Sequence, residues 1–124
     1  MKILVMGATG YVGGRLVPRL VEAGHDVRCV TRRPAKLRGV AWTALVDVVA
    51  GDALERETLD QAMADIDVVY YLVHSIGSGA DFEESDRRAA RNTAEAAEAA
   101  GVKRIVYLGG LVPTGEAASA HLAS

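Results

Sequence analysis

Three glycines near the N-terminus have the spacing of a phosphate-binding turn. Gly7, Gly10 and Gly13 follow a short apolar run, residues 2–6, and precede a stretch with helical periodicity. Gly7 suits a tight turn, Gly10 leaves room for a pyrophosphate beside the main chain, and Gly13 allows close packing of helix on strand. The first turn of the helix offers backbone N–H groups and a positive dipole end to phosphate oxygens. Because the glycines lie between a strand and a helix, the pattern predicts a dinucleotide site rather than a purely structural turn.

Two arginines after the second apolar run indicate which dinucleotide is preferred. Folds that bind NAD usually place an acidic residue here, where it accepts a hydrogen bond from the ribose 2′-OH. This chain instead has Arg32 and Arg33 after Thr31. A guanidinium offers a planar fork of donors to a 2′-phosphate, so we expect NADP(H) as the cofactor and NAD(H) as the weaker ligand. Arg32 is the first expected contact and Arg33 the second. The alternative is solvated surface charge, which is our interpretation for Lys36 and Arg38.

The end of the fourth apolar run is a second place where a ligand is expected. Leu72, Val73 and His74 lie there, and ligands of open α/β sheets bind outside the carboxyl ends of the strands. We expect these three residues to line the ribose of the cofactor. Histidine is a common general acid or base, so His74 could also act in catalysis, but a single histidine at a strand end favours a structural role.

The elements that must position these residues alternate along the chain. Apolar runs predict five strands, at residues 2–6, 27–31, 45–50, 68–73 and 104–108. Helical patterns follow the first, third and fourth strands: one from Val12 to Gly24 with Val12, Leu16, Leu20 and Val21 on its buried face, and two at residues 57–63 and 81–100. Strands alternating with helices predict an α/β fold with a doubly wound parallel sheet, right-handed crossovers and strand order 3-2-1-4-5.

The glycine turn also carries a family resemblance. Residues 7–13 read Gly-Ala-Thr-Gly-Tyr-Val-Gly, which resembles the first turn of the short-chain dehydrogenase/reductase superfamily in its extended and atypical branches. Thr9, Tyr11 and Val12 are therefore expected to border the cofactor together with the glycines. The similarity covers nearly the whole chain in family order and points to the NAD(P)-binding, NmrA-like group; it continues in residues 31–33, 51–52, 70–75 and 107–111. The resemblance implies a Rossmann-type fold.

Two further residues have roles that the resemblance implies and that stay open. Asp52, after the third strand, matches a family position that meets the adenine amino group; a turn or helix N-cap, which Asp favours, is the alternative. Asn92, in the alanine-rich third helix, matches a position that helps to organise the site; a polar residue on the helix surface is the alternative.

The chain departs from the catalytic pattern of the active enzymes in this superfamily. Those enzymes use a Ser together with a Tyr and a Lys four residues apart. Gly109 and Gly110 stand where the Ser is common, and no Tyr-x-x-x-Lys follows. The catalytic residues are therefore unknown. Three functions stay open: an NADP(H)-dependent oxidoreductase-like protein, which we favour, a non-catalytic NADP redox-sensing module, and part of a sugar-nucleotide epimerase-like enzyme.

Composition limits the remaining possibilities. The chain has 124 residues, 50% of them hydrophobic, with a net charge of −2 and one cysteine. We expect residues 1–124 to form one NAD(P)-binding Rossmann domain, the N-terminal portion of a longer family fold whose C-terminal substrate part is absent. The single cysteine excludes a disulfide framework, and no signal peptide is recognisable, so we expect a cytoplasmic protein. We expect no metal site and neither a nucleic-acid nor a membrane partner. A small-molecule substrate and a homo-oligomer are possible partners.

Overall fold

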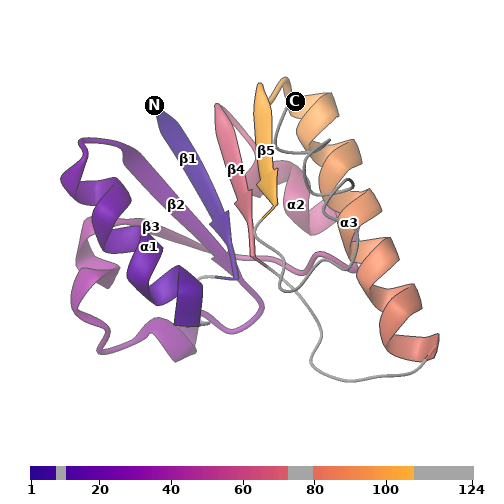
Figure 1. Ribbon diagram of the computed structural model, residues 1–124, viewed down its shortest axis with the longest axis horizontal. Helices are drawn as coiled ribbons and strands as arrows, with labels where there is room; N and C mark the ends of the chain where they lie inside the picture. Colours follow the sequence, from indigo (N-terminus) through magenta and orange to yellow (C-terminus); the bar gives the residue numbers. More distant parts are fainter. Residues whose placement is uncertain (8–10, 73–79, 108–124) are drawn as a thin grey trace.

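The sheet has five parallel strands. A computed structural model describes residues 1–7, 11–72 and 80–107 of the chain. Its strands are β1 (Lys2–Met6), β2 (Asp26–Thr31), β3 (Asp47–Ala50), β4 (Val68–Tyr71) and β5 (Arg104–Tyr107). They are hydrogen-bonded in the order β3-β2-β1-β4-β5, which is visible in Figure 1. The predicted doubly wound sheet with order 3-2-1-4-5 is therefore confirmed.

Helices cover both faces of this sheet. Helix α1 (Tyr11–Glu22) packs on one face over β1 and β2, whereas α2 (Arg56–Ala62) and α3 (Ala80–Ala100) pack against each other on the opposite face (Figure 1). This arrangement follows from right-handed crossovers, because the chain moves one way from β1 to β2 and the other way from β4 to β5. The result is a three-layer sandwich.

The side chains of β1 point alternately into two hydrophobic cores, one on each face of the sheet. Ile3 and Val5 join the cluster that includes Val17 of α1, whereas Leu4 and Met6 join the cluster that holds α2 and α3. All four side chains are at most 2% exposed. A strand that is covered on both faces has no need for polar alternation, which is why residues 2–6 read as an uninterrupted apolar run.

The segment before β3 differs from the prediction. We expected a strand over residues 45–50, but β3 begins at Asp47, and two short 3-10 helices, η1 (Pro34–Leu37) and η2 (Ala41–Leu45), precede it. Trp42 is buried in the α1-side core, while Leu45 is 65% exposed. The tight turn of η2 brings the Trp42 indole to the core. Because Leu45 is exposed and not buried, the strand does not need to begin at residue 45.

Two other boundaries and one helix face also differ. Val12 was expected on the buried face of the first helix but is 48% exposed, because it lies in the first turn of α1, beyond the end of the core. Strand β4 ends at Tyr71, although the next residue, Leu72, still donates its backbone N–H to the Met6 carbonyl at 2.9 Å. Val73 and Leu108, expected at the ends of the fourth and fifth strands, lie outside the described residues.

Candidate functional site

The predicted site residues that the structure describes follow the carboxyl ends of β1, β2, β3 and β4. In the parallel register, Met6 at the end of β1 pairs with Val30 of β2 on one side and with Tyr71 of β4 on the other. At the next strand along, Thr31 pairs with Ala50 at the end of β3. The chain reverses direction across the sheet between β1 and β4, and such a switch point is where open α/β sheets bind ligands.

Gly7 occupies the turn that leaves β1 at this switch point. Its φ is +91°, a left-handed conformation that residues with a Cβ avoid. A Cβ built on Gly7 would also lie 3.0 Å from the carbonyl carbon of Leu72 and 3.1 Å from the Leu72 Cβ. The backbones after β1 and after β4 therefore approach each other so closely that only glycine fits.

The first turn of α1 carries no negative charge. The helix begins at Tyr11 and continues through Val12 and the buried Gly13, with no acidic residue in its first turn. The first N–H groups of a helix lack partners within it, and no carboxylate of this turn competes for them, so the turn suits an anion. Val12 offers an exposed apolar side chain beside it. Thr9 and Gly10 lie outside the described residues.

The two arginines lie at the same edge, directly after β2. Both Arg32 and Arg33 are exposed, and the Arg33 backbone N–H donates to the Thr31 hydroxyl at 3.2 Å. Within the described part of the chain, neither guanidinium has a hydrogen bond or an ion pair. Both are therefore available to a ligand that lies over the end of β2.

The turn after β3 is held by local hydrogen bonds. Gly51 has no room for a side chain, because a Cβ would lie 2.7 Å from Val30 Cγ2. The Asp52 Oδ1 accepts the Leu54 backbone N–H at 2.9 Å, and the Asp52 backbone N–H donates to Thr58 Oγ1 at 2.8 Å. Asp52 thus forms a turn of the kind that its side chain favours. Its second carboxylate oxygen, Oδ2, is not needed for that turn, so the turn and an adenine contact are compatible.

Helix α3 reaches across to the same turn. The Asn92 side-chain Nδ2 donates to the Ala53 carbonyl at 2.8 Å, which fixes the turn from the opposite side to Thr58. Asn92 is half-buried and bonded to this turn, whereas its role in organising the site stays a prediction. A weaker connection lies beside it: Arg56 Nη1 is 3.4 Å from Glu95 Oε1, with both side chains at least 40% exposed. Exposed pairs of this kind contribute little to stability.

The ends of β4 and β5 carry an aromatic pair on the α3 side. The rings of Tyr71 and Tyr107 are 5.2 Å apart between centroids and tilted by 53°. Burial, followed by the charges of Tyr107 and Asp86, raises the pKa of Tyr71 to about 12, and burial raises the pKa of Tyr107. Both phenols stay protonated at neutral pH, which fits packing rather than proton abstraction. Leu72, next to Tyr71, is buried. Val73 and His74 lie outside the described residues.

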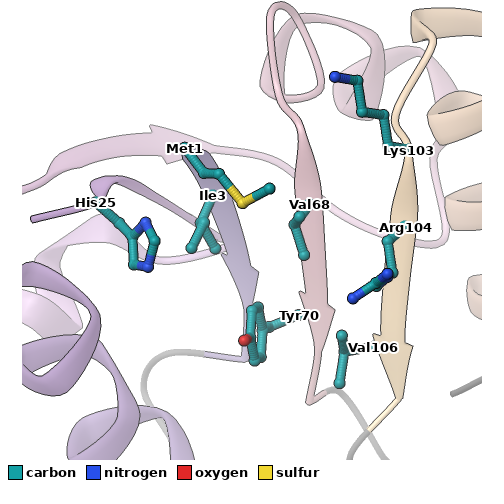
Figure 2. A pocket seen from close by; sticks show the side chains of 8 residues that line it. All are labelled: Met1, Ile3, His25, Val68, Tyr70, Lys103, Arg104 and Val106. Carbon is teal, nitrogen blue, oxygen red and sulfur yellow. The ribbon is translucent and has the colours of Figure 1, made fainter. Parts of the chain in front are cut away.

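A separate cavity of about 260 Å³ lies away from the glycine turn. Figure 2 shows its apolar side chains on β1, β4 and β5, among them Ile3, Val68 and Val106, with His25 and Arg104 at the rim. It lies on the sheet face that carries α1, beside β4 and β5, where α1 does not reach. The cavity contains none of the residues predicted to bind the dinucleotide.

The residues that the structure describes offer neither a metal-binding cluster nor a membrane-spanning helix. No group of three or more His, Cys, Asp and Glu side chains in this part of the chain could hold a metal ion. None of its helices combines the length and the apolar character needed to cross a membrane.

Comparison with known proteins identifies the family. The sequence profile of a family described as NAD(P)H-binding matches residues 7–122. The chain belongs to this NAD(P)H-binding family. The match includes the glycine turn, the arginines after β2 and the turn after β3, so the resemblance drawn from these motifs is confirmed.

Similar proteins place this NAD(P)H-binding chain among longer dehydrogenases and reductases. It is 40% identical over 108 residues to a (4-alkanoyl-5-oxo-2,5-dihydrofuran-3-yl)methyl phosphate reductase of Streptomyces griseus, covering 86% of this chain and 33% of the reductase. It is 34% identical over 116 residues to a 3-beta-hydroxysteroid dehydrogenase of Mycolicibacterium neoaurum, covering 86% of this chain and 31% of the dehydrogenase. The chain therefore spans about a third of the length of these relatives.

A solved structure supports the same family. A short-chain dehydrogenase/reductase superfamily protein from Agrobacterium tumefaciens, solved with bound NAD, superposes with a TM-score of 0.72 at 27% identity. The superposition covers 86% of this chain and 32% of that protein. The Rossmann-type fold of an NAD(P)-binding domain is thus shared by this chain and a protein of the superfamily that the glycine turn resembles.

Proposed function

We propose that this domain binds NADP(H) in preference to NAD(H) and supplies the cofactor half of an oxidoreductase of the atypical short-chain dehydrogenase/reductase type. The preference for NADP(H) is inferred from the end of β2. There Arg32 and Arg33 are exposed, and no acidic residue follows the strand. A carboxylate there would accept from a ribose 2′-OH and repel a 2′-phosphate, whereas a guanidinium binds the phosphate through charge-assisted hydrogen bonds.

The other contacts follow the edge of the sheet. The first turn of α1, with Gly7, Thr9, Gly10 and Gly13 around it, would hold the pyrophosphate, and Tyr11 and Val12 would border it. On the β3 side, Asp52 would accept a hydrogen bond from the adenine amino group. On the β4 side, Leu72, Val73 and His74 would line the ribose next to the nicotinamide.

Two features of the chain fit a dinucleotide. A turn at Gly7 that is too tight for a Cβ and a helix start without an acidic residue both suit a diphosphate. The nicotinamide, when bound, supplies hydride chemistry, and the residues of this chain bind and orient it. The reductase and dehydrogenase among the relatives support a reaction of that class, with a carbonyl or enone compound as the candidate substrate.

Titration with both reduced dinucleotides tests the preference. We expect NADPH to bind more tightly than NADH and Arg32→Ala to weaken NADPH about 10- to 100-fold, which is the contribution of charged hydrogen bonds, while NADH changes little. Arg38→Ala is the matched control, because Arg38 is also exposed but follows η1 rather than β2. Equal dissociation constants for NADPH and NADH in the unmodified protein would refute the preference.

Turnover is tested separately from binding. NADPH is mixed with the protein and a panel of carbonyl and enone compounds, and its oxidation is measured as the loss of reduced-nicotinamide absorbance. Oxidation that depends on one of these compounds would support an oxidoreductase. Tight binding without any turnover would instead favour a binding module.

A further inference from the structure

We propose that Asn92 is a positioning residue for the adenine end of the dinucleotide, acting through the turn between β3 and α2. The proposal rests on the proposed function, since it needs a dinucleotide at the sheet edge. Its basis is the hydrogen bond from Asn92 Nδ2 to the Ala53 carbonyl, 2.8 Å long and partly buried, between residues 39 positions apart in the sequence. Ala53 directly follows Asp52, the residue expected to meet the base.

Local hydrogen bonds hold most of the turn, and the Ala53 carbonyl is held from α3 instead. It joins the end of β3 to α2, and its backbone N–H groups are used close by: Gly51 donates to the Thr31 carbonyl at 3.0 Å and Leu54 to the Asp52 carboxylate at 2.9 Å. Thr58 fixes the Asp52 backbone from the α2 side. The Ala53 carbonyl accepts its hydrogen bond from Asn92 Nδ2 on α3.

Helix α3 is a firm base for this contact. Thr93, next to Asn92, is fully buried, and its hydroxyl donates to the Ala89 carbonyl at 2.8 Å. Ala96 and Ala97, one turn further on, are buried against α2. The helix is therefore fixed in the core next to Asn92, and the hydrogen bond from the Asn92 side chain holds the turn in a defined position relative to this helix.

Asp52 can read the adenine amino group only if its free carboxylate oxygen points to a defined place. Loss of the Asn92 donor would leave the partly buried Ala53 carbonyl without its partner, and the turn would move to expose that carbonyl to water. The carboxylate would move with it. The expected effect is a loss of discrimination at the adenine amino group and not only a loss of affinity.

The experiment compares NADPH with its analogue that has hypoxanthine in place of adenine, using calorimetric titration. Hypoxanthine carries a carbonyl where adenine carries the amino group, so a carboxylate acceptor disfavours it. Two variants remove the donor: Asn92→Ala, and Asn92→Asp, which keeps the size of the side chain. We expect both to lower the ratio of the two affinities about three- to tenfold, the worth of one hydrogen bond.

Gln61→Ala is the matched control, because Gln61 carries the same amide group but is exposed on α2. It should leave the ratio unchanged. A general loosening of the fold would weaken both dinucleotides by the same factor, so an unchanged ratio in the Asn92 variants would overturn the proposal. A ratio near one in the unmodified protein would also overturn it, as would a failure of both variants to fold.

The failure of the proposed function has a different signature. If the unmodified protein retains neither NADPH nor NADH, the dinucleotide site itself is wrong. If it retains NADPH and the Asn92 variants keep the adenine preference, the site stands and only the role of Asn92 is wrong.

Discussion

Replacing Gly7 by alanine tests the geometry at the switch point most directly. Two costs add at this position. The φ of +91° is unfavourable for a residue with a Cβ by about 1–2 kcal/mol. The new methyl group would lie 3.0–3.2 Å from three atoms of Leu72, two of them backbone atoms. Leu72 is 6% exposed and its N–H is bonded to Met6, so it has little freedom to move. Overpacking of this kind costs about 1–3 kcal/mol.

Gly24→Ala separates the two costs. Gly24 ends α1 with a φ of +90°, but a Cβ there would meet nothing within 4 Å. It carries the conformational cost alone, about 1–2 kcal/mol. The lower chain entropy of the unfolded alanine variants offsets both substitutions equally. The difference between Gly7→Ala and Gly24→Ala should therefore be about 1–3 kcal/mol and should report the contact with Leu72.

Urea unfolding measures this difference, with the single tryptophan as the reporter. Trp42 is 8% exposed in the folded chain, so its emission should shift to longer wavelength on unfolding. Gly14→Ala is a second control, since Gly14 lies in α1 with open space around it, and alanine there should stabilise by about 0.5–1 kcal/mol. Equal destabilisation by Gly7→Ala and Gly24→Ala would refute the close approach of the two turns.

Two further predictions concern the core. Burial raises the pKa of the Cys29 thiol from 9.0 to about 12, so the unfolded chain loses this proton at lower pH than the folded chain. The contribution of Cys29 to the free energy of unfolding is therefore complete below pH 9 and is lost as the pH rises towards 12. Urea midpoints measured at rising pH should fall, and they should fall less steeply in Cys29→Ala. A midpoint independent of pH from 8 to about 11 would contradict this cause. Trp42→Ala should cost about 3 kcal/mol by loss of a buried ring, whereas Leu45→Ala, at a side chain 65% exposed, should change stability by less than about 0.5 kcal/mol in unfolding followed by circular dichroism.

The sequence predicted the elements with strong local patterns. The apolar run of β1 and the glycine turn after it identify a buried parallel strand and its crossover, and alternation of strands and helices then limits the topology to few choices. The segment before β3 was harder. Trp42 and Leu45 are both apolar, and no local pattern states that one is buried and the other exposed.

The candidate site was predictable where backbone geometry dictates the residue type. Gly7 has both a positive φ and no space for a side chain, so its type carries the information. Asp52 is different, because the same side chain suits a turn and an adenine contact. The hydrogen bond of Asn92 could not be predicted from the residues alone. Its acceptor is the main-chain carbonyl of Ala53, and every residue type has such a carbonyl.

The central place of β1 has a consequence for the order of folding. Strand β1 pairs with β2 soon after it is synthesised, but its other neighbour is β4, where Ile3 pairs with Val68. At a synthesis rate of about 5–20 residues per second, the stretch from Thr31 to Val68 takes about 2 to 7 seconds. During that time one edge of β1, which is apolar from Ile3 to Met6, is without its partner. Completion of the sheet therefore depends on a late, long-range closure, and the nascent chain is most exposed to aggregation just before β4 arrives.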